Sequence, residues 1–112
     1  MKLISTTLAG FILTLSAVST SADTDVLFIG NSFTYGFGSA ARFYRADTVT
    51  DLNNEGIGGV PALFKSFTDQ AGLDYDVSLE TRGGSGLDFH LESKLGVIGR
   101  QPWDQVVMHG YS

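Results

Sequence analysis

The sequence predicts an α/β fold organised around a parallel β-sheet. Short runs of apolar and β-branched residues alternate along the chain with segments of helical periodicity, as is typical of parallel sheets with crossover helices. Glycine accounts for 14 of the 112 residues, more than the usual ~7%, and several glycines lie in turns directly after the predicted strands. Because the carboxyl ends of parallel strands meet at one edge, we expect these turns to share one rim of the sheet.

The composition excludes several classes of protein. The chain has twelve Asp and Glu against seven Lys and Arg, a formal net charge of −5, whereas a nucleic-acid binder would show a basic stripe. Charged residues make up 17% and aromatic residues 12% of the chain, unlike a disordered tail. With no cysteine, a disulfide framework, a thiolate metal site and a cysteine nucleophile are excluded. The length allows one domain at most.

The first 22 residues have the layout of a secretory signal peptide. This stretch carries one charge, Lys2, residues 8–18 are mostly apolar, and small residues precede and include Ala22. We therefore expect cleavage after Ala22, a mature chain of residues 23–112, and a periplasmic or secreted location. The apolar run is shorter than the ~20 residues of a membrane span. A buried N-terminal helix is the alternative.

Three segments have the pattern of β-strands. Residues 24–29 are mostly apolar or β-branched and end at Gly30, which suits a central parallel strand buried on both faces. Residues 76–81 alternate apolar and polar side chains, and residues 103–109 have an apolar centre. We expect these three segments to form the sheet.

Two segments have the pattern of helices. Residues 60–71 carry apolar side chains on one face and polar ones such as Ser66 on the other, with Pro61 in the first turn and Gly72 just past the end. The face that we expect to be buried consists of Val60, Leu63, Phe64, Phe67 and Ala71. Residues 87–95 predict a second, short helix after a glycine-rich turn.

The segment between residues 35 and 59 allows two interpretations. Residues 40–46 suit a helical turn and residues 47–52 an extended piece, but the whole segment also suits a long excursion around a site. Aromatic residues near its start predict core packing and loop anchoring, with a wall for a sugar or acyl group as the alternative; they are Phe33, Tyr35, Phe37, Phe43 and Tyr44. Three acidic residues without a metal-loop pattern predict a solvated face; they are Asp47, Asp51 and Glu55.

The clearest chemical signal is Gly30-Asn31-Ser32, directly after the first predicted strand. A serine here can direct its hydroxyl into the crevice where open parallel sheets bind ligands, and the N–H groups of a following helix can stabilise a developing negative charge. A helix cap or turn is the alternative. The motif is not a Gly-x-Ser-x-Gly elbow, because Thr34 replaces the second glycine, nor a phosphate loop, because no lysine follows the glycines.

Two further turns follow the other predicted strands. Residues 82–87 contain consecutive glycines and open a helix, so their N–H groups suit an anion or an oxyanion; a plain flexible turn is the alternative. Residues 109–112 follow the third strand at the same edge. The convergence of three such turns favours a functional rim more than any single motif does.

These segments resemble the SGNH, or GDSL-like, hydrolase superfamily, in a secreted and poorly characterised branch. Residues 25–34 are similar to its first block, with Gly-Asn-Ser in place of Gly-Asp-Ser. Residues 83–87 with His90 are similar to its second block, and residues 106–109 resemble the strand that leads to its third. The resemblance implies a three-layer α/β/α flavodoxin-like SGNH hydrolase fold and a serine esterase that transfers acyl groups from small esters or acylated carbohydrates to water.

The resemblance also assigns roles to individual residues. Ser32 matches the nucleophile, and its own N–H forms part of the oxyanion hole. Gly84 matches the residue whose N–H is the second donor, with Gly83 as the alternative one residue out of register. The family's third donor is an asparagine that has no counterpart here, and His109 and Ser112 are the candidates to replace it. The resemblance implies no metal or nucleotide cofactor and leaves the oligomeric state open.

The family's Asp-x-x-His block, which supplies the base, is not found in this sequence. A serine hydroxyl is a poor nucleophile without a base. His90 suits a structural or capping role, and His109 lies on the expected rim without an obvious carboxylate partner. We therefore expect residues 23–112 to form the N-terminal part of an SGNH hydrolase-like domain, truncated after the third strand. A non-catalytic periplasmic α/β binding module and an inactive fragment are the alternatives.

Overall fold

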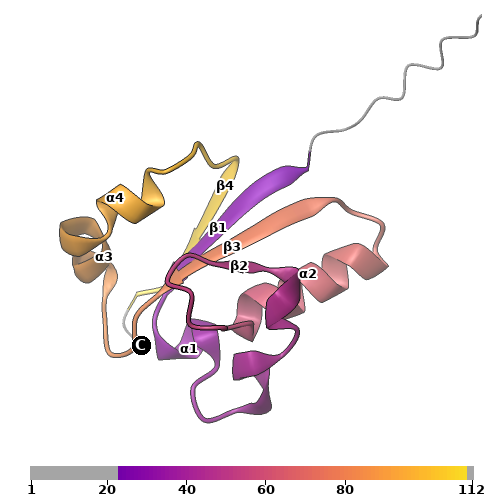
Figure 1. Ribbon diagram of the computed structural model, residues 1–112, viewed down its shortest axis with the longest axis horizontal. Helices are drawn as coiled ribbons and strands as arrows, with labels where there is room; N and C mark the ends of the chain where they lie inside the picture. The colour runs from indigo at the N-terminus through magenta and orange to yellow at the C-terminus, as the bar shows by residue number, and fades with distance from the viewer. Residues whose placement is uncertain (1–22, 111–112) are drawn as a thin grey trace, which may run out of the picture.

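A four-stranded parallel sheet lies at the centre of residues 23–110, the part of the chain that the computed structural model describes (Figure 1). The strands, which lie side by side in the order β2-β3-β1-β4, are β1 (Thr24–Gly30), β2 (Thr50–Asp51), β3 (Tyr75–Thr81) and β4 (Gln105–Met108). The predicted α/β class and parallel sheet are confirmed, and the three predicted strands are β1, β3 and β4. The predicted signal peptide of residues 1–22 and the candidate Ser112 lie outside the described residues.

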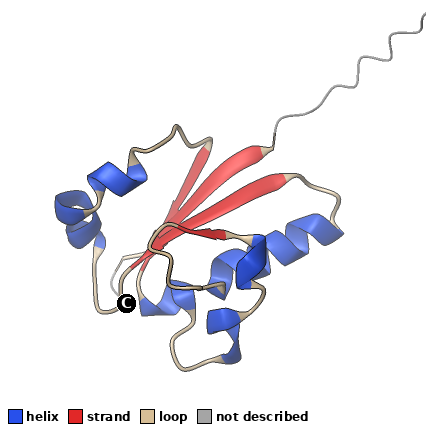
Figure 2. Cartoon of the chain, in the orientation of Figure 1, coloured by secondary structure: helices blue, strands red, loops and turns tan. Residues whose placement is uncertain are grey.

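Helices and turns fill the connections between the strands (Figure 2). They are α1 (Ser32–Tyr35), η1 (Ala40–Phe43), η2 (Ala46–Thr48), α2 (Gly59–Gln70), α3 (Leu87–Ser93) and α4 (Leu95–Ile98). The helix expected at 60–71 is confirmed as α2. The helix expected at 87–95 is divided at Lys94, where a φ of −123° interrupts the helical backbone. Between residues 35 and 59, the 3-10 helices and the short β2 agree with the first of the two interpretations, a helical turn followed by an extended piece.

The helices lie on both faces of the sheet. Side chains alternate along a strand, so the ring of Phe28 faces α2 and packs 5.3 Å from the ring of Phe64, whereas Ile29 faces α3 and α4. The core on the α2 side consists of Val26, Phe28, Ile57, Val77 and Leu79. On the opposite side, Leu27 is fully buried, together with the polar residues Glu80 and His90.

The face that α2 buries differs from the predicted one. Val60 and Phe67 are 43% and 65% exposed, whereas Ser66, which the pattern placed on the polar face, is buried. The reason is the close approach of the helix to α1, because a Cβ on Gly59 would lie 2.6 Å from the carbonyl oxygen of Thr34. Mostly small side chains fit on the packed side, and the buried residues of α2 are Gly59, Pro61, Ala62, Ser66 and Thr68.

Candidate functional site

The three turns singled out in the sequence begin side by side at one rim of the sheet. The N–H of Arg82, just after β3, donates to the carbonyl of Gly30 at the end of β1 at 3.1 Å. The N–H of His109, just after β4, donates to the carbonyl of Ile29 at 2.8 Å. The residues that follow β4 therefore lie beside the end of β1, just before α1.

Asn31 ties the three turns together. Its side chain is buried, and its Oδ1 accepts from the N–H of Phe33 at 3.1 Å, which caps α1. Its Nδ2 donates to the carbonyl of Ser85 at 3.1 Å and to the carbonyl of Gly110 at 3.0 Å. An aspartate could accept the first bond but could not donate the other two. The sequence interpretation passed over this role, although an amide that caps a helix always keeps two spare donors.

Ser32 is the first residue of α1 and is half-buried. Neither its hydroxyl nor its backbone N–H has a hydrogen-bond partner within residues 23–110. The turn before it requires glycine, because a Cβ on Gly30 would overlap the hydroxyl of Thr34. The buried Thr34 thereby brings α1 down onto the end of β1 and leaves Ser32 at the rim.

Gly83 and Gly84 form the exposed part of the second turn. Gly84 has a φ of +69°, a conformation that favours glycine, and its N–H has no partner among the described residues. Gly83 lies against α1, since a Cβ there would lie 2.7 Å from the hydroxyl of Tyr35. Gly83 thus lies next to the helix that carries Ser32, and Gly84 follows it in the same turn.

His90 lies behind the rim, where it is 2% exposed. Its Nδ1 contacts Oε2 of the fully buried Glu80. Its Nε2 lies 3.1 Å from the carbonyl oxygen of Gly30 and 3.2 Å from the hydroxyl oxygen of Ser85. These contacts agree with the structural role expected for His90.

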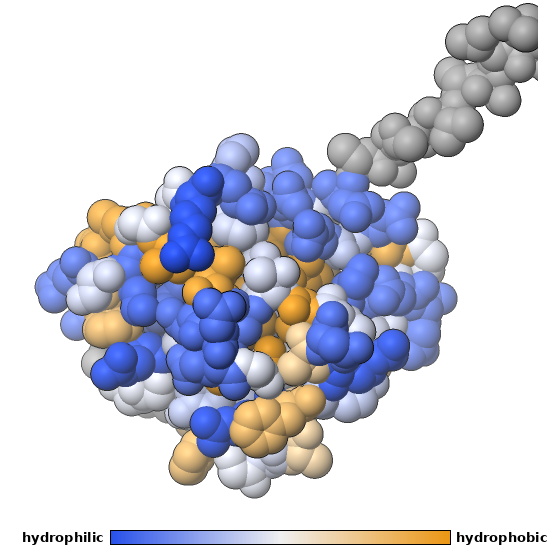
Figure 3. Space-filling view, viewed as in Figure 1, coloured by the Kyte–Doolittle hydropathy of each residue, from blue (hydrophilic) through white to orange (hydrophobic). Residues whose placement is uncertain are grey.

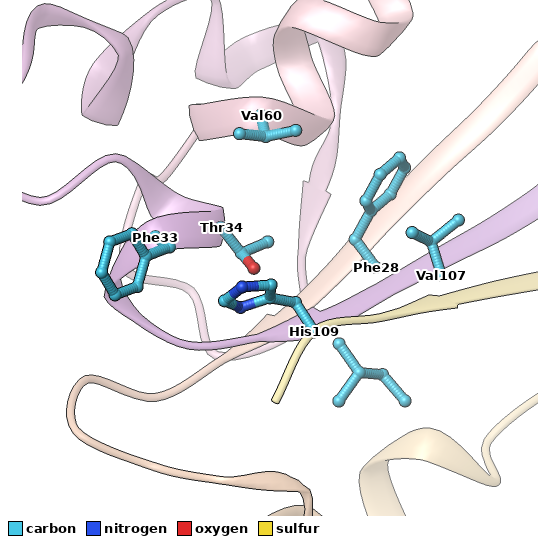
Figure 4. Close-up of a pocket in the computed structure, with 7 residues that line it drawn as sticks. Phe28, Phe33, Thr34, Val60, Val107 and His109 are labelled. Atoms are coloured by element: carbon cyan, nitrogen blue, oxygen red, sulfur yellow. The ribbon is translucent and has the colours of Figure 1, made fainter. Parts of the chain in front are cut away.

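His109 lies on the exposed side of the rim. Its ring centroid is 5.8 Å from that of Phe33, and it forms one wall of a pocket of about 170 Å³ (Figure 4). The pocket is lined by Phe28, Ile29, Phe33, Thr34, Val60, Val107 and His109. Within residues 23–110, no carboxylate forms a hydrogen bond or an ion pair with the His109 ring. Its environment therefore differs from that of a histidine oriented to act as a base.

Of the aromatic residues after Ser32, Tyr35 packs against the core as predicted, whereas the three phenylalanines do not, which corrects the prediction of core packing for them. Phe33, Phe37 and Phe43 are 61%, 68% and 64% exposed. The guanidinium of Arg42 stacks 5.2 Å from the ring of Tyr35, with the rings of Phe37 and Phe43 also within 6 Å. Figure 3 shows apolar surface near η1 at the foot of the molecule. A surface that combines exposed rings with a cation suits a ligand wall, the alternative interpretation.

Asp47 and Glu55 of the predicted acidic face are exposed, whereas the third residue, Asp51, is a structural carboxylate. The two oxygens of Asp51 accept the N–H groups of Asn53, Glu55 and Ile57 at 2.9 to 3.2 Å. Asp51 therefore shapes the loop that leads into α2. Across the described part of the chain, no group of three or more acidic or histidine side chains is arranged to hold a metal ion.

Comparison of the chain with protein-family models, with curated proteins and with solved structures found no match. Between residues 23 and 110, no helix is long and apolar enough to cross a bilayer. The functional conclusion therefore depends on the contacts at the rim.

Proposed function

We propose that residues 23–112 form the N-terminal part of a secreted SGNH-type serine esterase in which Ser32 is the nucleophile. The observation that carries the proposal is the clamp made by Asn31, whose side chain binds the turns after β1, β3 and β4. These are the three turns that resemble the family's successive blocks. Three loops without a common role would not be expected to share hydrogen bonds with one buried amide side chain.

The sheet topology supports the same proposal. When the two-residue β2 is set aside, the three longer strands lie in the order β3-β1-β4. The first strand along the chain is thus the central one, flanked by the second and the third. Flavodoxin-like sheets begin with this 2-1-3 order and bind ligands at the carboxyl end of the first strand. Ser32 follows that strand.

In the proposed reaction, the Ser32 oxygen attacks an ester carbonyl as a base removes the hydroxyl proton. The N–H groups of Ser32 and Gly84, which have no partner among the described residues, hold the oxyanion of the tetrahedral intermediate. The leaving alcohol takes the proton, and water then hydrolyses the acyl-enzyme. Neither histidine of the sequence suits the role of this base, because His90 is buried and held by Glu80, and the exposed His109 lacks a carboxylate partner among the described residues.

The test is hydrolysis of a chromogenic acetate ester by the full chain, with and without added imidazole as a base from solution. We expect imidazole to accelerate the protein-dependent rate, and Ser32→Ala to lower that rate at least ~100-fold. Ser93→Ala is the matched control, because Ser93 is exposed at the end of α3. Equal rates for the wild type and Ser32→Ala would remove Ser32 as the nucleophile.

The second candidate is a non-catalytic module that binds a carbohydrate or an anion. The surface of Arg42 with Phe37 and Phe43 favours it, and it requires no base. In that case, binding of an acetylated oligosaccharide survives Ser32→Ala, weakens in Phe37→Ala, and is not followed by release of acetate. Release of acetate that depends on Ser32 decides for the esterase.

A further inference from the structure

A buried cluster behind the rim supplies no reacting group to the proposed reaction. Glu80, Ser85 and His90 are 0%, 6% and 2% exposed and come from β3, from the glycine turn and from α3. Serine, histidine and glutamate in this order of contacts are reminiscent of a catalytic triad. The hydrogen-bond directions exclude that interpretation.

The protons of the cluster can be assigned from its partners. The carbonyl of Gly30 can only accept, so Nε2 of His90, 3.1 Å away, carries a proton and donates it. The hydroxyl of Ser85 donates its single proton to the carbonyl of Arg82 at 2.7 Å, so its oxygen accepts from the same Nε2–H at 3.2 Å. His90 therefore has no free lone pair on Nε2 with which to take a proton from Ser85.

The other side of the imidazole is fixed as well. A carboxylate oxygen only accepts, so the contact between Nδ1 of His90 and Oε2 of Glu80 places a second proton on the ring, and the pair is an imidazolium beside a carboxylate. The second oxygen, Oε1, accepts from Nδ2 of Asn53 at 2.8 Å and lies 3.7 Å from Nζ of Lys94. The carboxylate thus holds the ring in one orientation, with Nε2–H directed at the end of β1 and at the glycine turn.

We propose that Glu80 and His90 are a positioning pair that sets the distance between the two oxyanion donors. The Gly30 carbonyl lies two residues before Ser32, and Ser85 directly follows Gly84. One imidazole N–H contacts both turns, so a change in the ring position changes the relation between the N–H groups of Ser32 and Gly84. Misplacement of a reacting group by about 1 Å costs on the order of 100-fold in rate. This inference rests on the proposed esterase function.

The test compares three variants of the full chain. His90→Ala removes both contacts of the ring, whereas His90→Gln retains a donor that reaches the Gly30 carbonyl but gives Glu80 no imidazole partner. Leu91→Ala is the control, because its side chain is 64% exposed on the same helix. The number of competent sites is counted by complete reaction of Ser32 with a fluorophosphonate. The chromogenic ester with imidazole then gives kcat per competent site and KM.

We expect His90→Ala to lower kcat per competent site about 100-fold without a change in KM, His90→Gln to lower it about 10-fold, and Leu91→Ala to leave it unchanged. A purely structural role for His90 would reduce the number of competent sites while kcat per site stayed at the wild-type value, and that result overturns the proposal. If His90→Ala does not fold, His90→Gln decides by the same criterion.

A second readout separates this proposal from the esterase function. If the wild type hydrolyses no ester, the esterase proposal fails, and the backbone amide resonances of Ser32 and Gly84 decide the positioning role. We expect both resonances to shift in His90→Gln and neither to shift in Leu91→Ala. Resonances that stay at their wild-type positions in His90→Gln overturn the positioning role.

Discussion

The covered half of the sheet, strands β1 and β3, buries far more of its residues than the open half, the edge strand β4. β1 and β3 each bury five consecutive residues, whereas all four residues of β4 are exposed. β1 lies between two other strands, while β4 pairs with β1 alone among the described strands. Val106, Val107 and Met108 are 43%, 45% and 61% exposed, although their side chains are as apolar as those of β1.

Apolar grooves flank β4 on both faces. The pocket beside His109 lies on the α2 side, and a larger groove of about 500 Å³ lies on the side of α3 and α4. The larger groove is lined mainly by apolar residues; they include Ile29, Leu87, Leu91, Leu95, Ile98, Val106 and Met108. We therefore expect β4, an edge strand with apolar surface on both faces, to favour association.

The comparison separates the parts of the candidate site by how firmly they are held. Ser32 and the glycine turn follow the two covered strands. The side chains of Asn31 and His90 both form hydrogen bonds to these turns. His109 follows the open strand, where an aromatic contact with Phe33 is its main side-chain neighbour. The proposed nucleophile and the proposed oxyanion donors therefore lie in turns that buried side chains hold, whereas His109 and Gly110 are held by the backbone bond from His109 to Ile29 and by the bond from Asn31 to Gly110.

The largest expected effect is that of Asn31→Asp, which breaks the link between the two halves. The carboxylate still caps α1 but can no longer donate to the carbonyls of Ser85 and Gly110. The buried carbonyl of Ser85 and the half-buried carbonyl of Gly110 lose their partner and face a negative charge, so we expect a loss of about 3–5 kcal/mol in the free energy of unfolding, measured with denaturant. Asn31→Ser keeps a cap without the charge and should lose less. A cost below about 1 kcal/mol for Asn31→Asp would show that the clamp is not what holds the turns together.

The next effect compares the same truncation in the two halves. Val77 of β3 is 1% exposed and Val107 of β4 is 45% exposed. We expect Val77→Ala to cost about 2–3 kcal/mol and Val107→Ala about half of that or less, because less apolar surface leaves water at β4. Unfolding by denaturant measures both values. Equal costs would mean that β4 is covered in solution by contacts with other molecules.

Met108→Lys should change the free energy of unfolding less than the variants above, and it should weaken self-association. The added charge lies in the groove beside α3 and α4, so it should weaken self-association and the binding of an apolar dye. The free energy of unfolding should change by no more than about 0.5 kcal/mol, because the side chain is exposed. Gln105→Lys adds the same charge on β4 without removing an apolar side chain. If both variants associate as strongly as the wild type in sedimentation measurements, β4 is not the site of association.

The sequence predicted the strands well because each has a local pattern. The apolar run of β1, the alternation in β3 and the apolar centre of β4 are all readable without knowledge of their neighbours. The buried face of α2 was wrong for the opposite reason. Its orientation depends on the approach of Gly59 to α1, a contact between segments more than twenty residues apart, and no pattern within the helix reports it.

The candidate site was predicted in part for the same physical reason. Turns after parallel strands must meet at one edge, so the convergence of the three turns follows from topology. The clamp of Asn31 and the orientation of His90 depend on which carbonyls lie within 3.1 Å of their donors, and those distances arise only when the strands are in register. The exposure of Phe37 and Phe43 also depends on tertiary structure, because segments distant in the sequence determine whether an aromatic side chain is buried.

The smallest expected effect concerns Asp25, the second residue of β1, at the end of the sheet opposite the rim. Burial, followed by the neighbouring carboxylates of Asp76, Asp104 and Asp23, raises the pKa of Asp25 above its ordinary value of 3.8. The folded chain therefore binds this proton more tightly than the unfolded chain, and stability falls as the pH rises from 3.8 through the raised pKa. We expect Asp25→Asn to be slightly more stable than the wild type at neutral pH and equal to it below pH 3.8, in thermal unfolding across that range. Asp47→Asn, at an exposed position, should show no such difference. An advantage for Asp25→Asn that persists unchanged at low pH would mean that packing, rather than charge, distinguishes the two side chains.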